Sequence, residues 1–241
     1  MSVLFIVAQV VAVWLVTDFL SGLFHWIEDA YGDPSWPIVG RHVTKPNILH
    51  HYAPRAFVTN SWFLSSRLLL AICTLITAVT VALGVFNWMV ALAMVLGVNA
   101  NQVHKWSHRS RRENGVVVRL LQRLHLIQSP SHHHRHHVGG KDSHYCVLTD
   151  VLNPVLDGLG FWRGLERLLA RLFGLTRRDD ETMARTVLQE DPAVFGVHLE
   201  AVQQQVAREA RARARCDVRE RKTAPDKVRG GHERGRVVQR P

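Results

Sequence analysis

Cysteine is scarce and unpaired in this chain of 241 residues. The three cysteines, Cys73, Cys146 and Cys216, are far apart in the sequence and form no CxxC motif. So small and scattered a set supplies no disulfide framework. It also lacks the paired thiolates of structural zinc sites and iron–sulfur clusters, so we expect neither in this protein.

Charge is almost absent from a first long stretch at the N-terminus. Between Val3 and Phe24 the only charged residue is Asp18. The stretch is close to the ~20 residues that a helix needs to span a bilayer. A secretory signal peptide is the alternative, but no Lys or Arg precedes the apolar run and no clear small-residue cleavage site is present. We therefore predict a membrane span.

A second stretch, from Phe63 to Val103, contains one charged residue, Arg67. A single helix of this length would be ~60 Å long, about twice the ~30 Å hydrocarbon core of a bilayer. Two spans joined by a tight turn fit better, and the sequence LGVFNW, with Gly84 and Asn87, is typical of such a turn. The sequence thus predicts an all-α membrane protein with three transmembrane helices, or four with a re-entrant segment.

Basic residues outside the spans predict the orientation of the protein. The N-terminus and the turn at Gly84 carry no Lys or Arg, whereas the loop before the second span and the segment after the third are basic. By the positive-inside rule the basic side is cytoplasmic, in a bacterial inner membrane or, for a eukaryotic protein, the endoplasmic reticulum. The basic residues are Arg41, Lys45, Arg55, Lys105, Arg109, Arg111 and Arg112.

The C-terminal part of the chain differs in composition from the rest. Between Arg208 and Pro241, twelve Lys or Arg outnumber five Asp or Glu, and large apolar residues are few. This composition is typical of a disordered tail, whose charge could bind nucleic acid or anionic lipid or could simply aid solubility. We expect no nucleic-acid partner. We divide the chain into a membrane-embedded domain at 1–178, a helical extension at 179–206 and a basic tail at 207–241.

Histidine is abundant, with 15 residues, and its placement follows the predicted topology. One histidine closes the first span, a pair precedes the second, another pair follows the third, and five lie in the stretch SPSHHHRHHVGG. All of these groups fall on the cytoplasmic side, which predicts a His-rich helical cap on that face. The groups are His25, His50–His51, His104–His108, and His132, His133, His134, His136 and His137.

The spacing of these histidines indicates metal binding. Several pairs are four residues apart and so share one face of a helix, which is a usual way to present two imidazoles to one ion. For the five-histidine stretch alone, a loose zinc or nickel trap and a pH-sensitive surface are alternatives. The i,i+4 pairs are His104/His108, His132/His136 and His133/His137.

Nine imidazoles suit two iron ions with four or five ligands each and room for dioxygen. Carboxylates do not recur with the histidines as they do in soluble di-iron bundles with Glu-x-x-His motifs. An all-imidazole site next to a membrane favours non-haem iron and oxygen chemistry on a lipid chain. The predicted ligands are His25, His50, His51, His104, His108, His132, His133, His136 and His137.

The motifs resemble those of the lipid desaturase domain family, also called the Kua family. The resemblance covers roughly Asp18 to Glu166, in the family's order and at compatible spacing. It is carried by DFLSGLFHW, the His50–His51 pair, NQVHKWSH, SHHHRHH and HYCVLTDVLNPVLDGLGFWRGLE. The combination of NQVHKWSH with an HHxxHH pattern is specific to this family. Val151 stands where the family often has Trp, so the resemblance implies the type of reaction more firmly than it implies the substrate.

The resemblance implies an O2-dependent desaturase with a di-iron centre, closest to the plasmanylethanolamine desaturase type, which forms the vinyl ether bond of plasmalogens from an sn-1 alkyl ether lipid. It implies an ether phospholipid substrate and electrons from a cytochrome b5-like or ferredoxin-like protein on the cytoplasmic face. The family's histidine boxes map onto His104, His108, His132, His133, His136 and His137, the expected catalytic residues. His125 also matches a family histidine, whereas His134 and His144 do not match and are left out of the ligand set.

Three further residues are expected to support the ligands. Asp18 lies two helical turns before His25 and on the same face, so we expect its carboxylate to orient a ligand histidine. Asn101 and His125 are expected to play similar parts. The segments Val116 to Ile127 and Phe161 to Leu175 are amphipathic and are predicted to lie in the membrane interface or to pack on the metal domain.

Two other functions are compatible with the sequence. An acyl-lipid desaturase or hydroxylase would use the same iron site on an ester-linked chain. A metal-binding membrane sensor or transporter would not be an enzyme, but it would need a polar path through the spans, and the stretch from Leu68 to Val98 has little polarity.

Overall fold

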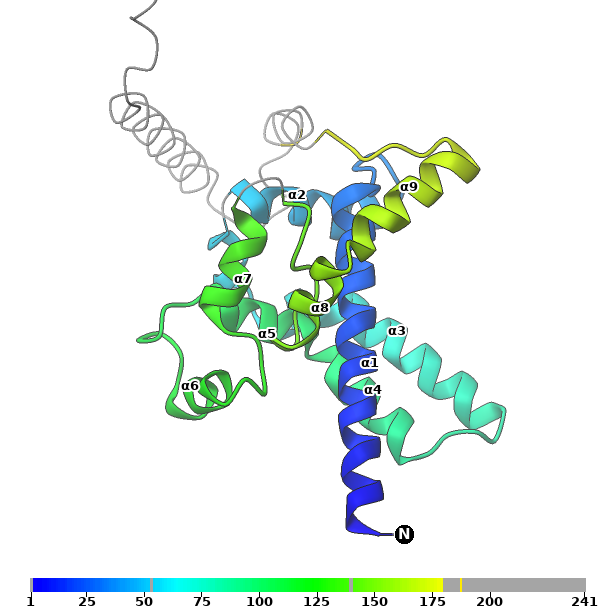
Figure 1. The fold of residues 1–241 in the computed structure, drawn as a ribbon, viewed down its shortest axis with the longest axis vertical. Helices are drawn as coiled ribbons and strands as arrows, with labels where there is room; N and C mark the ends of the chain where they lie inside the picture. Colours follow the sequence, from blue (N-terminus) through cyan, green and yellow to red (C-terminus); the bar gives the residue numbers. More distant parts are fainter. Residues whose placement is uncertain (1, 53, 139–140, 180–186, 188–241) are drawn as a thin grey trace, which may run out of the picture.

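The computed structural model describes residues 2–52, 54–138, 141–179 and 187. All regular secondary structure in these residues is helical, which confirms the all-α prediction. Figure 1 shows a long helix, α1, with a helical hairpin against its N-terminal half and a cluster of shorter helices around its C-terminal half. The predicted helical extension lies outside the described residues except for Asp179 and Val187, and the basic tail lies wholly outside them.

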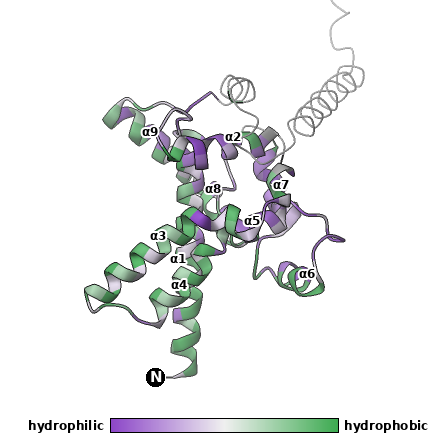
Figure 2. Cartoon of the chain, turned by 180° about the vertical axis from the view of Figure 1, so that it is seen from behind, coloured by the Kyte–Doolittle hydropathy of each residue, from purple (hydrophilic) through white to green (hydrophobic). Residues whose placement is uncertain are grey.

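Helix α1 (Val3–Ala30) joins the apolar part of the molecule to the polar part. Ser2 caps its N-terminus, because its hydroxyl accepts a hydrogen bond from the Phe5 amide. Only 11% of its most apolar 18-residue stretch is buried, so the apolar side chains there face outward, as expected for contact with lipid. Its C-terminal half buries polar side chains, including Asp18, His25 and Asp29. Figure 2 shows this change from hydrophobic to hydrophilic along the molecule.

Helices α3 (Trp62–Ala82) and α4 (Trp88–Val98) form the hairpin beside α1. The turn predicted between them is confirmed: Gly84 adopts a φ of 67°, which a residue with a Cβ rarely adopts, and the Asn87 side chain caps α4. Helix α4 has 11 residues and is therefore only ~16 Å long. Helix α5 (Ala100–Ser107) follows after a break at Asn99.

Two helices of the described residues, α1 and α3, are long and apolar enough to cross a membrane. The third predicted span corresponds to the shorter apolar helix α4, so the three-span topology and its cytoplasmic orientation stay predictions. The apolar side chains of α1 and α3 are mostly exposed and do not form the core of a globular domain. This exposure fits a membrane protein.

The polar end of the molecule carries the histidines. It contains a π-helical turn (Gly40–Thr44), α2 (Lys45–Tyr52), a 3-10 turn (Ala56–Thr59), α5 and α7 (Pro130–His137). Helix α7 begins where it does because Ser129 accepts a hydrogen bond from the His132 amide and Pro130 occupies the first turn. These short helices surround the end of α1, where its buried polar residues lie.

Three further helices complete the described fold: α6 (Val116–Arg123), α8 (Leu152–Gly158) and α9 (Phe161–Phe173). Helix α9 packs on α1 through Trp162, whose ring lies 6.0 Å from that of Trp26, and both side chains are buried. The two predicted amphipathic segments form helices α6 and α9. These helices end at Arg123 and Phe173, earlier than the predicted ends at Ile127 and Leu175. Their place in a membrane interface stays a prediction.

Candidate metal centre

Eight of the nine predicted ligand histidines lie close together at the polar end of the molecule. They form two groups in which the potential ligand atoms all lie within 4.8 Å of one another. The two groups adjoin, since the ring centroids of His25 and His104 are 5.3 Å apart. The first group is His50, His104, His108, His133 and His137, and the second is His25, Asp29, His51 and His136.

The first group is built around His133 on α7. Its Nε2 atom lies 2.9 Å from Nε2 of His104, 2.9 Å from Nε2 of His108 and 3.1 Å from Nε2 of His137. Nε2 of His104 and Nε2 of His108 are also only 3.1 Å apart. In a neutral imidazole, each ring nitrogen is either a donor or an acceptor. Three nitrogens that all contact one another cannot all form hydrogen bonds, so at least one pair must repel unless a cation lies between them.

The second group adds a carboxylate that the sequence analysis missed. Oδ1 of Asp29 lies 3.0 Å from Nε2 of His51, and its Oδ2 lies 3.2 Å from Nε2 of His136. Asp29 is 1% exposed, and His25 lies one turn earlier on the same helix. The i,i+4 spacing of His25 and Asp29 in HWIED was the available signal, but one acidic residue at that spacing does not point to a metal site by itself.

Adjacent histidines are divided between the two groups. His50 belongs to the first group and His51 to the second, and the same is true of His137 and His136. Successive side chains on a helix point about 100° apart, so each HH pair can serve two neighbouring sites. The i,i+4 pairs that share a group are His104/His108 and His133/His137.

Main-chain carbonyls orient several of these rings. Nδ1 of His25 contacts the carbonyl oxygen of Tyr145 at 3.0 Å, and Nδ1 of His136 contacts that of Ser143 at 2.7 Å. On α2, Nδ1 of His50 lies 2.5 Å from the carbonyl oxygen of Asn47. A carbonyl accepts a hydrogen bond only from a protonated Nδ1, so in a neutral ring each contact leaves Nε2 unprotonated and directed into its group.

Burial keeps four histidines of the first group neutral. Desolvation, together with the neighbouring imidazoles, holds the pKa of His50, His104, His133 and His137 well below its usual value. Nε2 of His25 and Nε2 of His50 are buried without a hydrogen-bond partner among the described residues. Neutral nitrogens with free lone pairs are the form that binds metal, so the residues present fit two metal ions.

An aromatic side chain covers the first group. Phe57, in the 3-10 turn, has its ring centroid 5.0 Å from that of His104, 5.2 Å from His108 and 5.8 Å from His50. Polar contacts hold this turn against α5, because Lys105 donates to the carbonyl of Asn60 and Arg109 to that of Val58. Phe57 therefore lies between the histidines and the outside of the cap.

His132 is the one predicted ligand that belongs to neither group. The Asn153 amide lies 3.1 Å from its Nε2, and because that amide nitrogen can only donate, it uses the lone pair that a metal would need. Its Nδ1 lies 3.9 Å from Asp150, and its ring lies 5.0 Å from that of His144. His132 and His136 are thus four residues apart in α7, but only His136 belongs to a histidine group, whereas His132 contacts Asn153.

Among the described residues, no hydrogen bond or ion pair joins the three predicted supporting residues to a histidine of either group. The carboxylate of Asp18 accepts hydrogen bonds from the Leu148 amide and the Thr149 hydroxyl. It thereby fixes to α1 the segment whose Tyr145 carbonyl meets His25. Asn101 donates to the carbonyl of Ser65.

His125 is exposed and pairs with Asp150 at 3.0 Å. The two histidines left out of the ligand set lie outside both groups as well. His134 is exposed on α7, and His144 pairs with Asp157 at 2.9 Å.

The fold and the site define a class of protein: a helical membrane protein whose exposed apolar helices lead into a buried pair of histidine-rich groups. The chain belongs to the lipid desaturase domain family, whose model matches residues 14–180. It is therefore a member of a family of oxidoreductases that act on lipids. The two histidine groups fit the histidine boxes expected of such a protein.

Three relatives illustrate the range of the family. Plasmanylethanolamine desaturase 1 of Mus musculus is 34% identical over an alignment of 189 residues, which covers 73% of this chain and 69% of the relative. Plasmanylethanolamine desaturase of Myxococcus xanthus is 31% identical, over 70% of this chain and 62% of the relative. Fatty acid desaturase 4-like 1, chloroplastic, of Arabidopsis thaliana is 30% identical, over 67% of this chain and 56% of the relative. No solved structure matches the chain.

Proposed function

We propose that the protein is an O2-dependent membrane lipid desaturase with two iron ions, which forms the vinyl ether bond of a plasmalogen from an sn-1 alkyl ether phospholipid. The observation that carries the proposal is the pair of buried histidine groups at the end of lipid-facing helices. A lipid chain held among these helices would extend toward the histidines. The similarity to two plasmanylethanolamine desaturases supports the choice of substrate.

The histidines of each group would hold one iron ion through Nε2, with Asp29 as the one carboxylate ligand. When bound, the two irons supply the oxidising power of dioxygen that an unactivated C–H bond requires. Asp29 offsets part of the added positive charge in a buried site. The carbonyls of Asn47, Ser143 and Tyr145 keep the imidazoles in the required orientation. Phe57 limits the access of water.

The overall reaction balances with an external electron donor. Two hydrogen atoms leave adjacent carbons of the alkyl chain, and the new C=C bond forms between these carbons. Dioxygen receives four electrons, two from the C–H bonds and two from the donor, and with two further protons it becomes two molecules of water. A cytochrome b5-like or ferredoxin-like protein on the cytoplasmic face is the proposed donor.

A second candidate function is desaturation of an ester-linked acyl chain. The similarity to the chloroplastic fatty acid desaturase of Arabidopsis thaliana favours this alternative. The same histidine groups would serve either substrate, because both reactions remove hydrogens from unactivated carbons. The lipid product therefore decides between them.

Lipid analysis of an expressing host tests the proposal. A host that makes alkyl ether phospholipids but no plasmalogens should acquire acid-labile vinyl ethers when it expresses the protein. The variant His133→Ala should abolish them, since His133 is the centre of the first group, whereas His134→Ala is the matched control on the exposed side of the same helix. New acyl double bonds without vinyl ethers would favour the second candidate. One zinc ion per chain, with no iron and no lipid product, would show a metal-binding protein instead.

A further inference from the structure

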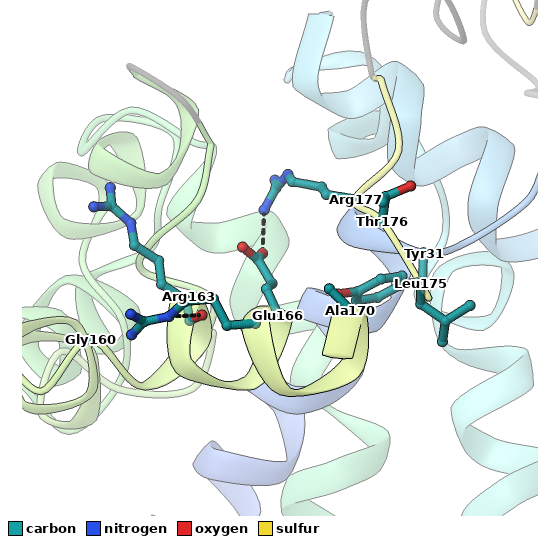
Figure 3. A pocket seen from close by; sticks show the side chains of 9 residues that line it. Tyr31, Gly160, Arg163, Glu166, Ala170, Leu175, Thr176 and Arg177 are labelled. Carbon is teal, nitrogen blue, oxygen red and sulfur yellow. Dashed lines mark hydrogen bonds and ion pairs between the residues drawn. The ribbon is translucent and has the colours of Figure 1, made fainter. Parts of the chain in front are cut away.

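An open pocket of about 630 Å³ lies beside α9, outside the two histidine groups. It is formed by one face of α9, the segment that follows this helix and the residue after the end of α1. Figure 3 shows arginine side chains around it and the ion pair between Glu166 and Arg177. The side chains that matter for its chemistry are Tyr31, Arg163, Glu166, Arg167 and Arg177.

The face around this pocket is positively charged. Arg163, Arg167 and Arg171 follow one another at intervals of four residues and so share one side of α9. Glu166 is the only acidic residue of this helix, and it is already paired with Arg177 at 2.9 Å. Arg163 is 71% exposed although it contacts Asp142. A negatively charged partner would therefore meet a surplus of arginines here.

A single buried side chain connects the pocket with the second histidine group. Arg177 donates a hydrogen bond of 2.7 Å to the Tyr145 hydroxyl. On its other side, the Tyr145 ring lies 5.2 Å from the His136 ring and 6.0 Å from the His25 ring. Tyr145 is 0% exposed. Only one tyrosine thus separates the pocket wall from the proposed iron ligands.

A continuous row of aromatic rings follows the same direction. Tyr31, in the pocket wall, lies 5.2 Å from Trp26, which lies 6.0 Å from Trp162. Trp162 lies 5.0 Å from Tyr145. The two tryptophans and Tyr145 are also the core of this part of the molecule, so their packing keeps the distances between the rings short and constant.

This wall of buried rings would block a lipid chain but would not prevent electron transfer. A chain that entered the pocket would meet the buried rings of Tyr145 and Trp162 before any histidine. An electron needs no open channel, and its transfer rate falls steeply with distance, so closely packed rings favour it. The position of the pocket therefore suits a partner that supplies electrons and not one that supplies the reacting carbons.

We propose that the arginine face of α9 is the docking surface for an acidic one-electron carrier with a haem or an iron–sulfur cluster. This inference rests on the proposed desaturase function, which needs two electrons per turnover. A one-electron carrier must bind and leave twice in each cycle, so a small charged face that forms a transient complex suits it. The carrier is oxidised by one electron at each visit, and the electron passes by way of Tyr145 toward the histidine groups.

Binding measurements on the full chain in zwitterionic nanodiscs test this proposal. The probes are the soluble haem domain of a cytochrome b5 and a plant-type ferredoxin. The double variant Arg163→Glu/Arg167→Glu should raise the Kd for the acidic carrier at least about tenfold at low ionic strength, and high salt should shrink the difference. The control Arg112→Glu/Arg123→Glu makes the same change of charge around α6, where both arginines are exposed, and should change the Kd less than about twofold.

A second readout separates docking from chemistry. The double variant should turn over as fast as the unaltered protein with the small mediator methyl viologen, because that mediator needs no docking surface. An unchanged Kd, or an equal rise in the control, would overturn the proposal. If the Kd is unchanged but the double variant loses binding to phosphatidylglycerol vesicles, the proposal is overturned and this face is a membrane contact instead. Normal carrier binding by a protein that yields no desaturated lipid would instead refute the proposed function alone.

Discussion

Replacement of Asp29 by Asn is the sharpest test of the second metal group. Asp29→Asn keeps the shape of the side chain and an oxygen atom but removes the negative charge that lies 3.0 Å from His51 and 3.2 Å from His136. Asn47, whose amide donates to Asp29, can still pair with the new amide. The substitution therefore changes the charge of the group with little change in packing.

The expected loss of metal affinity follows from that charge. One carboxylate and a divalent ion attract each other by about 8 kcal/mol at ~4 Å and an effective dielectric constant of ~20, which is a lower bound for a carboxylate that ligates the ion directly. The variant no longer has to bury the carboxylate, which offsets several kcal/mol of this attraction. The amide oxygen also remains a weaker ligand. We expect a net loss of about 3 kcal/mol, which raises the Kd for the second metal roughly 100-fold.

Metal analysis of the purified protein after dialysis against a moderate chelator measures this effect. The unaltered protein should keep two metal ions per chain and Asp29→Asn close to one. Asp18→Asn is the matched control, because Asp18 is equally buried in α1 but contacts main chain and Thr149 instead of histidines. It should keep both ions while its melting temperature falls, since an acceptor for a buried donor is lost. Two tightly held ions in Asp29→Asn would refute the reasoning.

Three other substitutions test separate parts of the structure. His132→Ala should keep both metal ions, and the loss of one would place that residue among the ligands after all. Gly22→Ala should destabilise the protein by about 1–3 kcal/mol in thermal unfolding, since a Cβ there would lie 2.6 Å from the Cys146 sulfur. Gly158→Ala is the control and should not destabilise the protein, because a Cβ there would have no atom within 4 Å. Equal destabilisation by both substitutions would contradict the role of the close approach between Gly22 and Cys146. Phe57→Ala should raise the ratio of dioxygen consumed to lipid desaturated, and a ratio unchanged from that of the unaltered protein would argue against Phe57 as a barrier to water.

Much of the architecture follows from local patterns in the sequence. The uncharged run that contains Gly84 and Asn87 is too long for one span, and the structure turns at those residues. The apolar run before His25 becomes one continuous helix that ends in the site. These features depend on helical geometry and on the cost of placing charge in lipid, and both can be judged from neighbouring residues alone.

The sequence by itself also determined which residue type could bind metal and on which helices, because imidazoles four residues apart share a helix face wherever the helix lies. Only the tertiary structure decided how the proposed ligands are divided. It places His50 and His137 in the first group and His51 and His136 in the second. It adds Asp29 to the second group. His132 lies outside both groups and contacts Asn153. The physical reason is that a metal group is defined by distances between different helices. Those distances depend on how α1, α2, α5 and α7 pack together, which no spacing within one helix encodes.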